Sequence, residues 1–266
     1  MCEPEKMKPS ALPRWRMRVA YDGRPFLGWQ RQEQGMTIQE GLETALAVAL
    51  RHPVACTGAG RTDTGVHARG QVVHFSSEAV KDPGKVLHSV RALVPRGISV
   101  RDLEPCGEDF SARYSAQWRE YCYRIRQNLD PLDPPNVWFP GRRFDPTKIA
   151  RAIQWFEGDH DFKSFCIPRD DGRHTRCTLM LCQAVELPGG VDIWIRGNRF
   201  LHRMVRSIVG FCMDVSRDRM GRDEFDRLIA GEQLPSRFWA PPDGLTLERV
   251  GYDGWTESAT RGQPDA

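Results

Sequence analysis

Apolar and polar residues alternate along residues 14–23, RWRMRVAYDG, as they do in a strand with one buried face. Residues 37–50, TIQEGLETALAVAL, repeat apolar residues at helical spacing instead, and Thr37 followed by Glu40 has the spacing of a helix N-cap. The apolar face of this helix is expected to comprise Ile38, Leu42, Ala45, Leu46 and Val48. Further elements of this half are strands at 54–60, 71–77 and 98–106 and a helix that begins at Asp82-Pro83.

The second half of the chain repeats this order of elements without repeating the sequence. It is expected to contain a strand at 116–127, a helix from Asp145-Pro146, strands at 175–189 and 191–198, helices at 200–218 and 221–231, and a closing strand at 245–254. Two successive β-α-β-β-α-β units predict an α+β protein made of two ferredoxin-like modules. Their mostly antiparallel central sheet would be flanked by helices, with an active-site cleft between the modules.

We place the first module at residues 14–110 and the second at 111–256, with 1–13 and 257–266 as flexible tails. No stretch approaches about eighteen apolar residues, and the N-terminus is too polar for a signal peptide. These features predict a cytoplasmic protein that does not enter a membrane. The eight cysteines contain no C-x-x-C pair, so we interpret them as small core residues and expect no metal site.

The basic residues are mostly arginine, since only six of the 38 are lysine, although the net charge is just +3. Arginine grips phosphate with a planar fork and stacks on bases, but a GC-rich genome would also favour its codons. Arginines alternate with aromatic residues at 14–21 and 110–126. Such strands can bind RNA, with bases stacked on the rings; equally, the rings could face the core and the arginines water.

One stretch, TGAGRTDTGVHARG at 57–70, encloses a single carboxylate, Asp63, among four glycines. It is not a phosphate loop, because Val66 and His67 stand where such a loop needs Lys and Ser or Thr. The glycines therefore predict close backbone approach around an exposed acid. His67 and His74 lack further ligands at metal spacing, which favours histidines that form hydrogen bonds.

The stretch GRTDTGVHARGQVVHF at 60–75 resembles the signature of the bacterial type A family of tRNA pseudouridine synthases. Further similarity to this family lies at 19–32, 37–46, 109–125, 200–210 and 240–253, so that it covers about residues 14–254. There are two departures. Thr64 stands where alanine is common, and residues 168–177 match poorly the family loop that contacts tRNA.

The resemblance implies an isomerase that converts uridine to pseudouridine in the anticodon stem-loop of tRNA, at positions 38, 39 and 40, after the base leaves the helix. It implies no cofactor and no metal, and it implies a homodimer. Asp63 would attack the ribose C1′ or the uracil C6, or assist departure of the base. Arg206 would pair with this acid and Arg61 would help extrude the base. Tyr121 would cover the uracil and is a candidate acceptor of the C5 proton.

The resemblance also implies a set of tRNA contacts away from the reacting atoms. These are Phe110, Ser111, Ala112, Arg113 and Tyr114, then Gln30 and Arg31, and in the poorly matched loop Gly172, Arg173, His174, Thr175 and Arg176. Two other classes of protein remain possible. A non-catalytic RNA-binding protein could share the modules but would have no use for the acid in its glycine bend. A carboxylate hydrolase would need a second acid beside Asp63, and the motif contains none.

Overall fold

The fold is described by a computed structural model that covers residues 12–128, 130, 132, 134, 136–167, 174–232 and 239–255. The first half contains β1 (Arg14–Tyr21), α1 (Ile38–Leu50), β2 (Thr57–Gly58), β3 (His67–Ser76), α2 (Pro83–Leu93) and β4 (Ile98–Cys106). The second half contains β5 (Trp118–Arg126), α3 (Pro146–Ile153), β6 (Gly158–Asp161), β7 (Arg176–Leu187), β8 (Gly190–Gly197), α4 (Met204–Ser216), α5 (Arg222–Ile229) and β9 (Leu245–Gly251).

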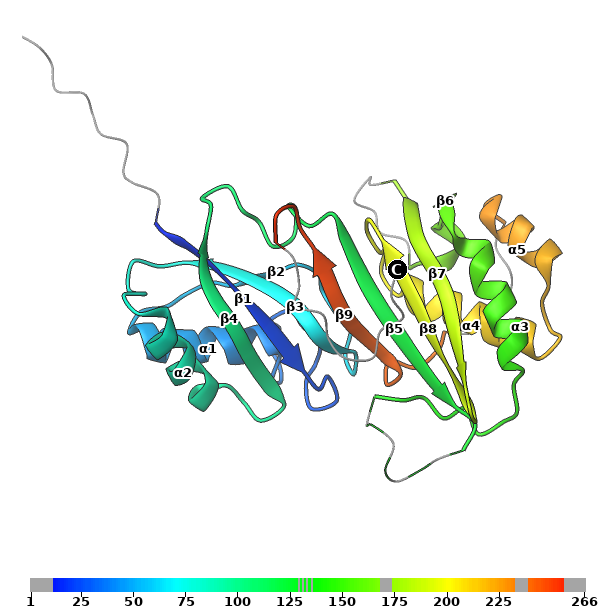
Figure 1. Cartoon of the computed structure of the whole chain (residues 1–266), viewed down its shortest axis with the longest axis horizontal. Helices are drawn as coiled ribbons and strands as arrows, with labels where there is room; N and C mark the ends of the chain where they lie inside the picture. The colour runs from blue at the N-terminus through cyan, green and yellow to red at the C-terminus, as the bar shows by residue number, and fades with distance from the viewer. Residues whose placement is uncertain are drawn as a thin grey trace, which may run out of the picture.

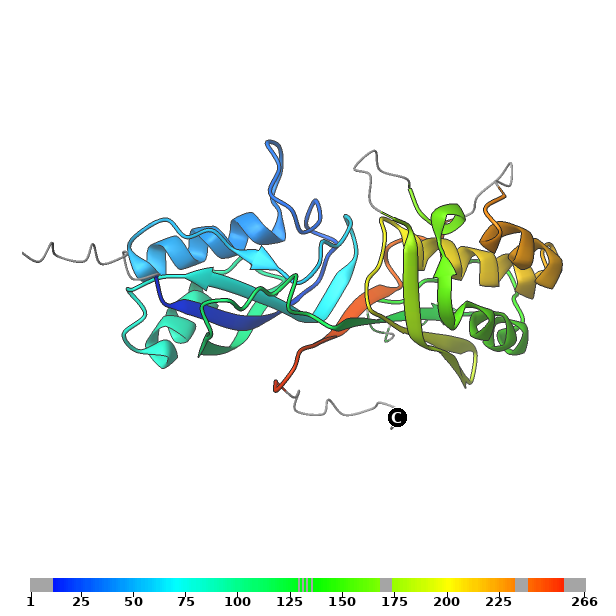
Figure 2. The ribbon, with the colours of Figure 1, turned by 90° about the horizontal axis from the view of Figure 1, so that it is seen from above.

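The strands of both halves join one mixed sheet with the order β4-β1-β3-β9-β5-β8-β7-β6, and β2 pairs with β3 beside it. The halves meet where the last strand of the chain, β9, runs parallel to β3 at His67 and Ala68. The named strands otherwise pair antiparallel. Helix α1 packs on α2, and α3 on α4, at opposite ends of the sheet (Figures 1 and 2). The predicted α+β fold of two β-α-β-β-α-β modules is confirmed.

The helix starts lie close to their predicted positions because polar caps fix them. Thr37, Asp82 and Asp145 each accept a hydrogen bond from a backbone N–H of the first helical turn. Helix α4 begins four residues later than predicted, because Arg203 adopts a left-handed conformation with φ 61° just before it. The expected strand at 54–60 shrinks to the two residues of β2, and β6 was not expected at all. Its sequence, GDHD, has no apolar alternation, and pairing with β7 alone makes it a strand.

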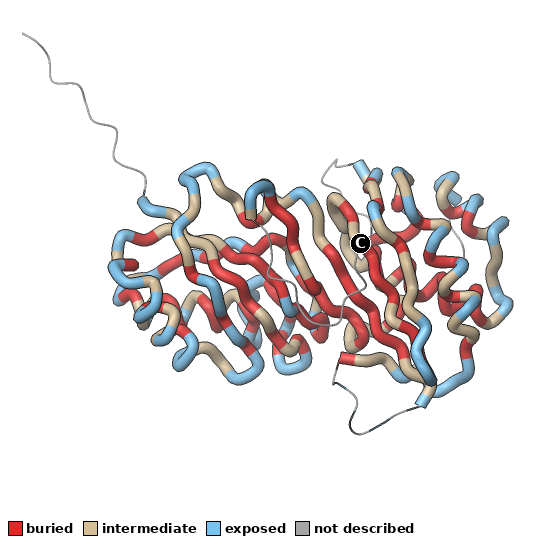
Figure 3. Tube along the Cα trace, viewed as in Figure 1, coloured by how far each residue is buried: buried red, intermediate tan, exposed pale blue. Residues whose placement is uncertain are grey.

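Buried positions concentrate in the strands and in the helix faces turned to them (Figure 3). On α1 the predicted apolar face is right except for Val48, which is 58% exposed and lies on the solvent side. Six of the seven cysteines in the described residues are buried, and all seven are unpaired, in keeping with core packing. Within the same residues, no helix has the length and apolar character needed to span a membrane.

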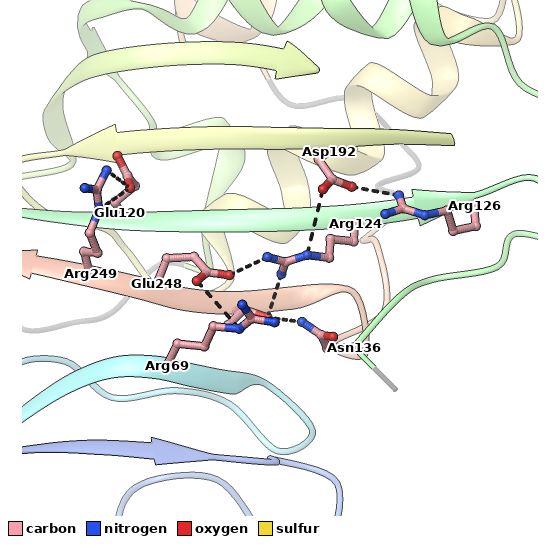
Figure 4. A network of polar contacts seen from close by, with 9 residues as sticks. Arg69, Glu120, Arg124, Arg126, Asn136, Asp192, Glu248 and Arg249 are labelled. Carbon is pink, nitrogen blue, oxygen red and sulfur yellow. Dashed lines mark hydrogen bonds and ion pairs between the residues drawn. The ribbon is translucent and has the colours of Figure 1, made fainter. Parts of the chain in front are cut away.

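Charged side chains are buried in the middle of the sheet, where they join neighbouring strands (Figure 4). Glu120 of β5, 1% exposed, binds Arg196 of β8 and Arg249 of β9, each at 2.7 Å. Arg124 donates to Glu248 of β9 at 2.7 Å. The alternative in which the aromatic rings face the core and the arginines face water therefore holds only in part, because several arginines form ion pairs within the sheet.

Candidate active site

The Asp63 loop, between β2 and β3, is shaped by contacts that only glycine permits. Gly28 has φ +84°, and a Cβ there would lie 2.8 Å from the Thr62 carbonyl oxygen. Gly65 has φ +82°, and a Cβ there would lie 2.8 Å from the Pro242 ring. The Val66 amide closes the turn by donating to the Asp63 carbonyl oxygen at 3.1 Å. The glycines thus let neighbouring segments press against the backbone on both sides of the acid.

Buried side chains anchor this loop from beneath. The hydroxyls of Tyr21 and Thr62 are hydrogen-bonded at 2.8 Å, and Gln71 of β3 donates to the Gly60 carbonyl oxygen at 2.7 Å. Burial raises the pKa of Tyr21 well above its usual value, so the phenol stays protonated in this contact. The loop is consequently held at Gly60 and Thr62, directly before the acid.

Two side chains, one just before α4 and one in its first turn, meet the Asp63 carboxylate. The guanidinium of Arg206 (Nη1) lies 3.2 Å from Oδ2, and the imidazole of His202 (Nε2) lies 3.6 Å from Oδ1. Arg206 also donates through Nε to the Ala240 carbonyl oxygen at 2.7 Å, which fixes the direction of its fork. The Asp63 side chain remains 28% exposed. A carboxylate in this setting is paired with a cation and still reachable from outside.

Tyr121 of β5 forms another wall beside the acid. Its ring packs edge-on against Phe200 with centroids 5.0 Å apart, and its hydroxyl lies 4.0 Å from where a Gly60 Cβ would stand. Burial raises the pKa of Tyr121 to about 12; the Asp63 charge adds to this rise and the Arg119 charge opposes it. The phenol is therefore protonated at neutral pH.

These groups line one cavity with a volume of about 1500 Å³. Of the residues predicted from the sequence, its walls include Asp63, Arg61, Tyr121, Arg206, Gln30, Arg113, Tyr114, His174 and Thr175. Three other predicted contacts, Phe110, Ser111 and Ala112, do not line the cavity. Ala112 is 0% exposed, and its backbone groups are hydrogen-bonded to His74 and Tyr252.

Two other predicted RNA contacts, Arg31 and Arg176, lie outside the cavity walls. Arg31 lies 3.4 Å from Glu43 and 3.7 Å from Glu40 of α1, which draws its charge towards that helix. Arg176 lies at the start of β7, outside the cavity walls, with its guanidinium 3.4 Å from Asp159. Gly172 and Arg173 lie outside the described residues.

Sequence reasoning missed several polar residues of this site, among them His202 and Arg119. His202 is four positions before Arg206, and that spacing in the expected helix could have suggested a shared partner. Arg119 stands two residues before Tyr121 on the same strand face. Its guanidinium donates to the carbonyl oxygens of Ala59, Arg113, Ala116 and Asn198. One cation thus ties together three segments of the cavity wall, and burial lowers its pKa.

A model of the tRNA pseudouridine synthase family matches residues 17–115 and 152–253. The chain belongs to the tRNA pseudouridine synthase family. It is 38% identical over 248 residues to tRNA pseudouridine synthase A of Neisseria gonorrhoeae, covering 91% of this chain and 92% of that protein. It is 37% identical over 259 residues to the Cutibacterium acnes protein of the same name, with 94% and 92% covered. It is 33% identical over 246 residues to tRNA pseudouridine synthase A 1 of Protochlamydia amoebophila, with 90% of this chain and 96% of that protein covered.

Proposed function

We propose that this chain isomerises uridine to pseudouridine in the anticodon stem-loop of tRNA, at positions 38, 39 and 40, on a base that has left its stack. The observation that carries the proposal is the Asp63 carboxylate, held 3.2 Å from Arg206 and open to a cavity of about 1500 Å³. Membership of the tRNA pseudouridine synthase family supports the same reaction.

The reaction needs no co-reactant, because substrate and product are isomers. The bond between C1′ and N1 breaks, the uracil turns, a bond between C1′ and C5 forms, and the C5 proton leaves while N1 gains one. Asp63 acts as an ionised carboxylate, by attack on C1′ or on C6 or by assisting departure of the base. Arg206 pairs with this carboxylate, and its second bond, to Ala240, fixes the direction of the guanidinium.

Tyr121 covers the base and is the candidate acceptor of the C5 proton. Because the pKa of this phenol is raised to about 12, very little phenolate exists at neutral pH. The hydroxyl can therefore accept a proton only while it passes its own proton on, and Tyr121 acts as a relay in this scheme.

RNA contacts extend from this centre over the cavity walls. Arg61 assists extrusion of the base and holds the vacated position, while Arg113 and Tyr114 project from the segment between β4 and β5. Tyr114 is strongly exposed beside the Arg113 guanidinium, and such a ring can stack on a base. We expect a homodimer in the cytoplasm, with one RNA arm crossing both subunits.

The direct test is an assay on unmodified tRNA by tritium release from C5 or by mass shift after derivatisation of pseudouridine. The purified chain should form pseudouridine at positions 38, 39 and 40 without added cofactor. Tight RNA binding with no product would instead support a non-catalytic RNA-binding protein, and would refute the proposal.

A further inference from the structure

His74 lies on β3, outside the cavity, yet its imidazole contacts a segment that forms part of the cavity wall. The Ala112 amide donates to His74 Nδ1 at 3.0 Å. The Ala112 carbonyl oxygen accepts a hydrogen bond from the Tyr252 hydroxyl at 2.6 Å. One residue is thus held at both of its backbone groups by side chains from β3 and from the chain just after β9.

Neighbouring positions of the same segment are fixed as well. Arg14 of β1 donates to the Phe110 carbonyl oxygen at 2.7 Å. The Phe110 ring packs on Tyr252 with centroids 5.2 Å apart, and edge-on against His74 at 6.2 Å. Immediately after Ala112 come Arg113 and Tyr114, which line the cavity. The backbone is anchored on one side, and the next two side chains reach the cavity.

We propose that His74 and Tyr252 are positioning residues for RNA binding, which hold the 110–114 segment so that Arg113 and Tyr114 meet the RNA. The inference rests on the proposed function, since it assigns these residues to the same RNA-bound site. Neither residue touches the cavity, so both act through the backbone of Ala112.

The His74 contact has a direction, and this makes it sensitive to pH. Nδ1 accepts the Ala112 N–H only when it carries no proton itself. Burial lowers the pKa of His74, and the charge of Arg14 lowers it further, so the accepting form prevails at neutral pH. Arg16 lies opposite His74 in the β1 register, β2 presents the uncharged Thr57, and the segment itself presents Phe110. Of these neighbours on β1, Arg14 disfavours protonation of His74 through its charge.

The test compares His74→Leu, which removes the acceptor, with His74→Asn, whose side-chain oxygen can occupy nearly the position of Nδ1. Steady-state kinetics and equilibrium binding of unmodified tRNA are measured on the full chain. We expect His74→Leu to raise KM and Kd about five- to tenfold, which is the loss of one hydrogen bond of about 1–1.4 kcal/mol. The kcat should stay within about twofold, because the acid and its partners are untouched, and Asn should restore most of the affinity.

A second readout is the pH profile of RNA binding. As the pH falls through the pKa of His74, which lies below the usual histidine value, the wild type should lose affinity relative to His74→Asn, because only the imidazole becomes protonated. His174 and His202 line the cavity in both proteins, so the ratio of the two affinities isolates the effect of His74. Identical profiles, or a Leu variant with wild-type KM, would overturn the proposal.

Amide exchange at Ala112 separates this inference from the proposed function, because it needs no RNA. Exchange should accelerate in His74→Leu and not in His74→Asn, and Tyr252→Phe should weaken tRNA binding although its ring stacking remains. His88→Leu, at an exposed position on α2, is the matched control and should change neither exchange nor affinity. If the wild type formed no pseudouridine, the proposed function would fail, whereas unaltered Ala112 exchange in His74→Leu would refute the positioning role alone.

Discussion

The Asp63 carboxylate has a close cation, Arg206, and also lines the cavity. Its replacement by asparagine keeps the shape and removes the nucleophile. We expect Asp63→Asn to form no detectable pseudouridine and to bind tRNA with a Kd within about threefold of wild type, because phosphate contacts do not use this acid. Product formation is measured by tritium release and binding by filter retention. Pseudouridine above background from a pure preparation would refute the role of Asp63.

Arg206 differs from an ordinary surface arginine in having two fixed acceptors, Asp63 and the Ala240 carbonyl oxygen. Arg206→Met should lower kcat by about 10- to 100-fold, since a charge-assisted hydrogen bond contributes about 1.5–3 kcal/mol. Arg206→Lys should recover only part of this, because one ammonium group cannot reproduce the fork. Arg222→Met on α5 serves as the control, since that arginine is exposed and outside the cavity. Normal turnover in Arg206→Met would show that the ion pair is dispensable.

At the scale of elements, the strands are joined by ion pairs as well as by backbone ladders. Glu120 lies between Arg196 and Arg249, so Glu120→Ala would leave two arginines without their carboxylate in the sheet. We expect a loss of about 3–5 kcal/mol in the free energy of unfolding, measured by urea denaturation. The control is Glu232→Ala, whose carboxylate forms an exposed pair with Arg227 and should cost less than about 1 kcal/mol. Equal effects of the two substitutions would contradict this view of the sheet centre.

For the whole molecule, alkaline pH should be destabilising. Burial raises the pKa of several thiols, among them Cys177 to about 11, and of Tyr121 to about 12. Above about pH 8.5 the unfolded chain loses thiol protons, and above about pH 10 phenol protons, that the native chain still holds. The unfolded state then binds fewer protons, so stability falls as pH rises.

This fall should approach about 1.4 kcal/mol per pH unit for each group while the pH lies between its unfolded and native pKa values. Urea unfolding at pH 7.5, 9 and 10.5 measures it, with reductant present to keep the thiols free. A free energy of unfolding that is unchanged between pH 7.5 and 10.5 would show that these groups ionise as readily in the native state.

The sequence by itself determined the order of elements, because alternation and helical spacing are local properties. It located the starts of α1, α2 and α3, since a cap residue such as Thr37 acts on the next three residues. The glycine bend around Asp63 could also be recognised from neighbouring residues alone. The resemblance to a family then predicted that Tyr121 and Arg206 belong to the same site. The local pattern did not predict β6, because this strand has no apolar alternation. It also placed Val48 wrongly in the buried face of α1, because helical spacing alone does not show how far the buried face extends around the helix.

Only the tertiary structure decided which distant groups meet. Asp63 and Arg206 are 143 positions apart, and their distance of 3.2 Å depends on how α4 crosses the sheet. The same holds for His74 of β3 and Tyr252 just after β9, which meet the Ala112 backbone although they are far apart in the chain. Nearly every residue has a backbone carbonyl and amide group, so the sequence does not show which side chain will bind a particular one. In the sequence, Arg119 cannot be told from the other arginines of an alternating strand. In the folded protein it donates to four carbonyl oxygens and so connects segments of the cavity wall.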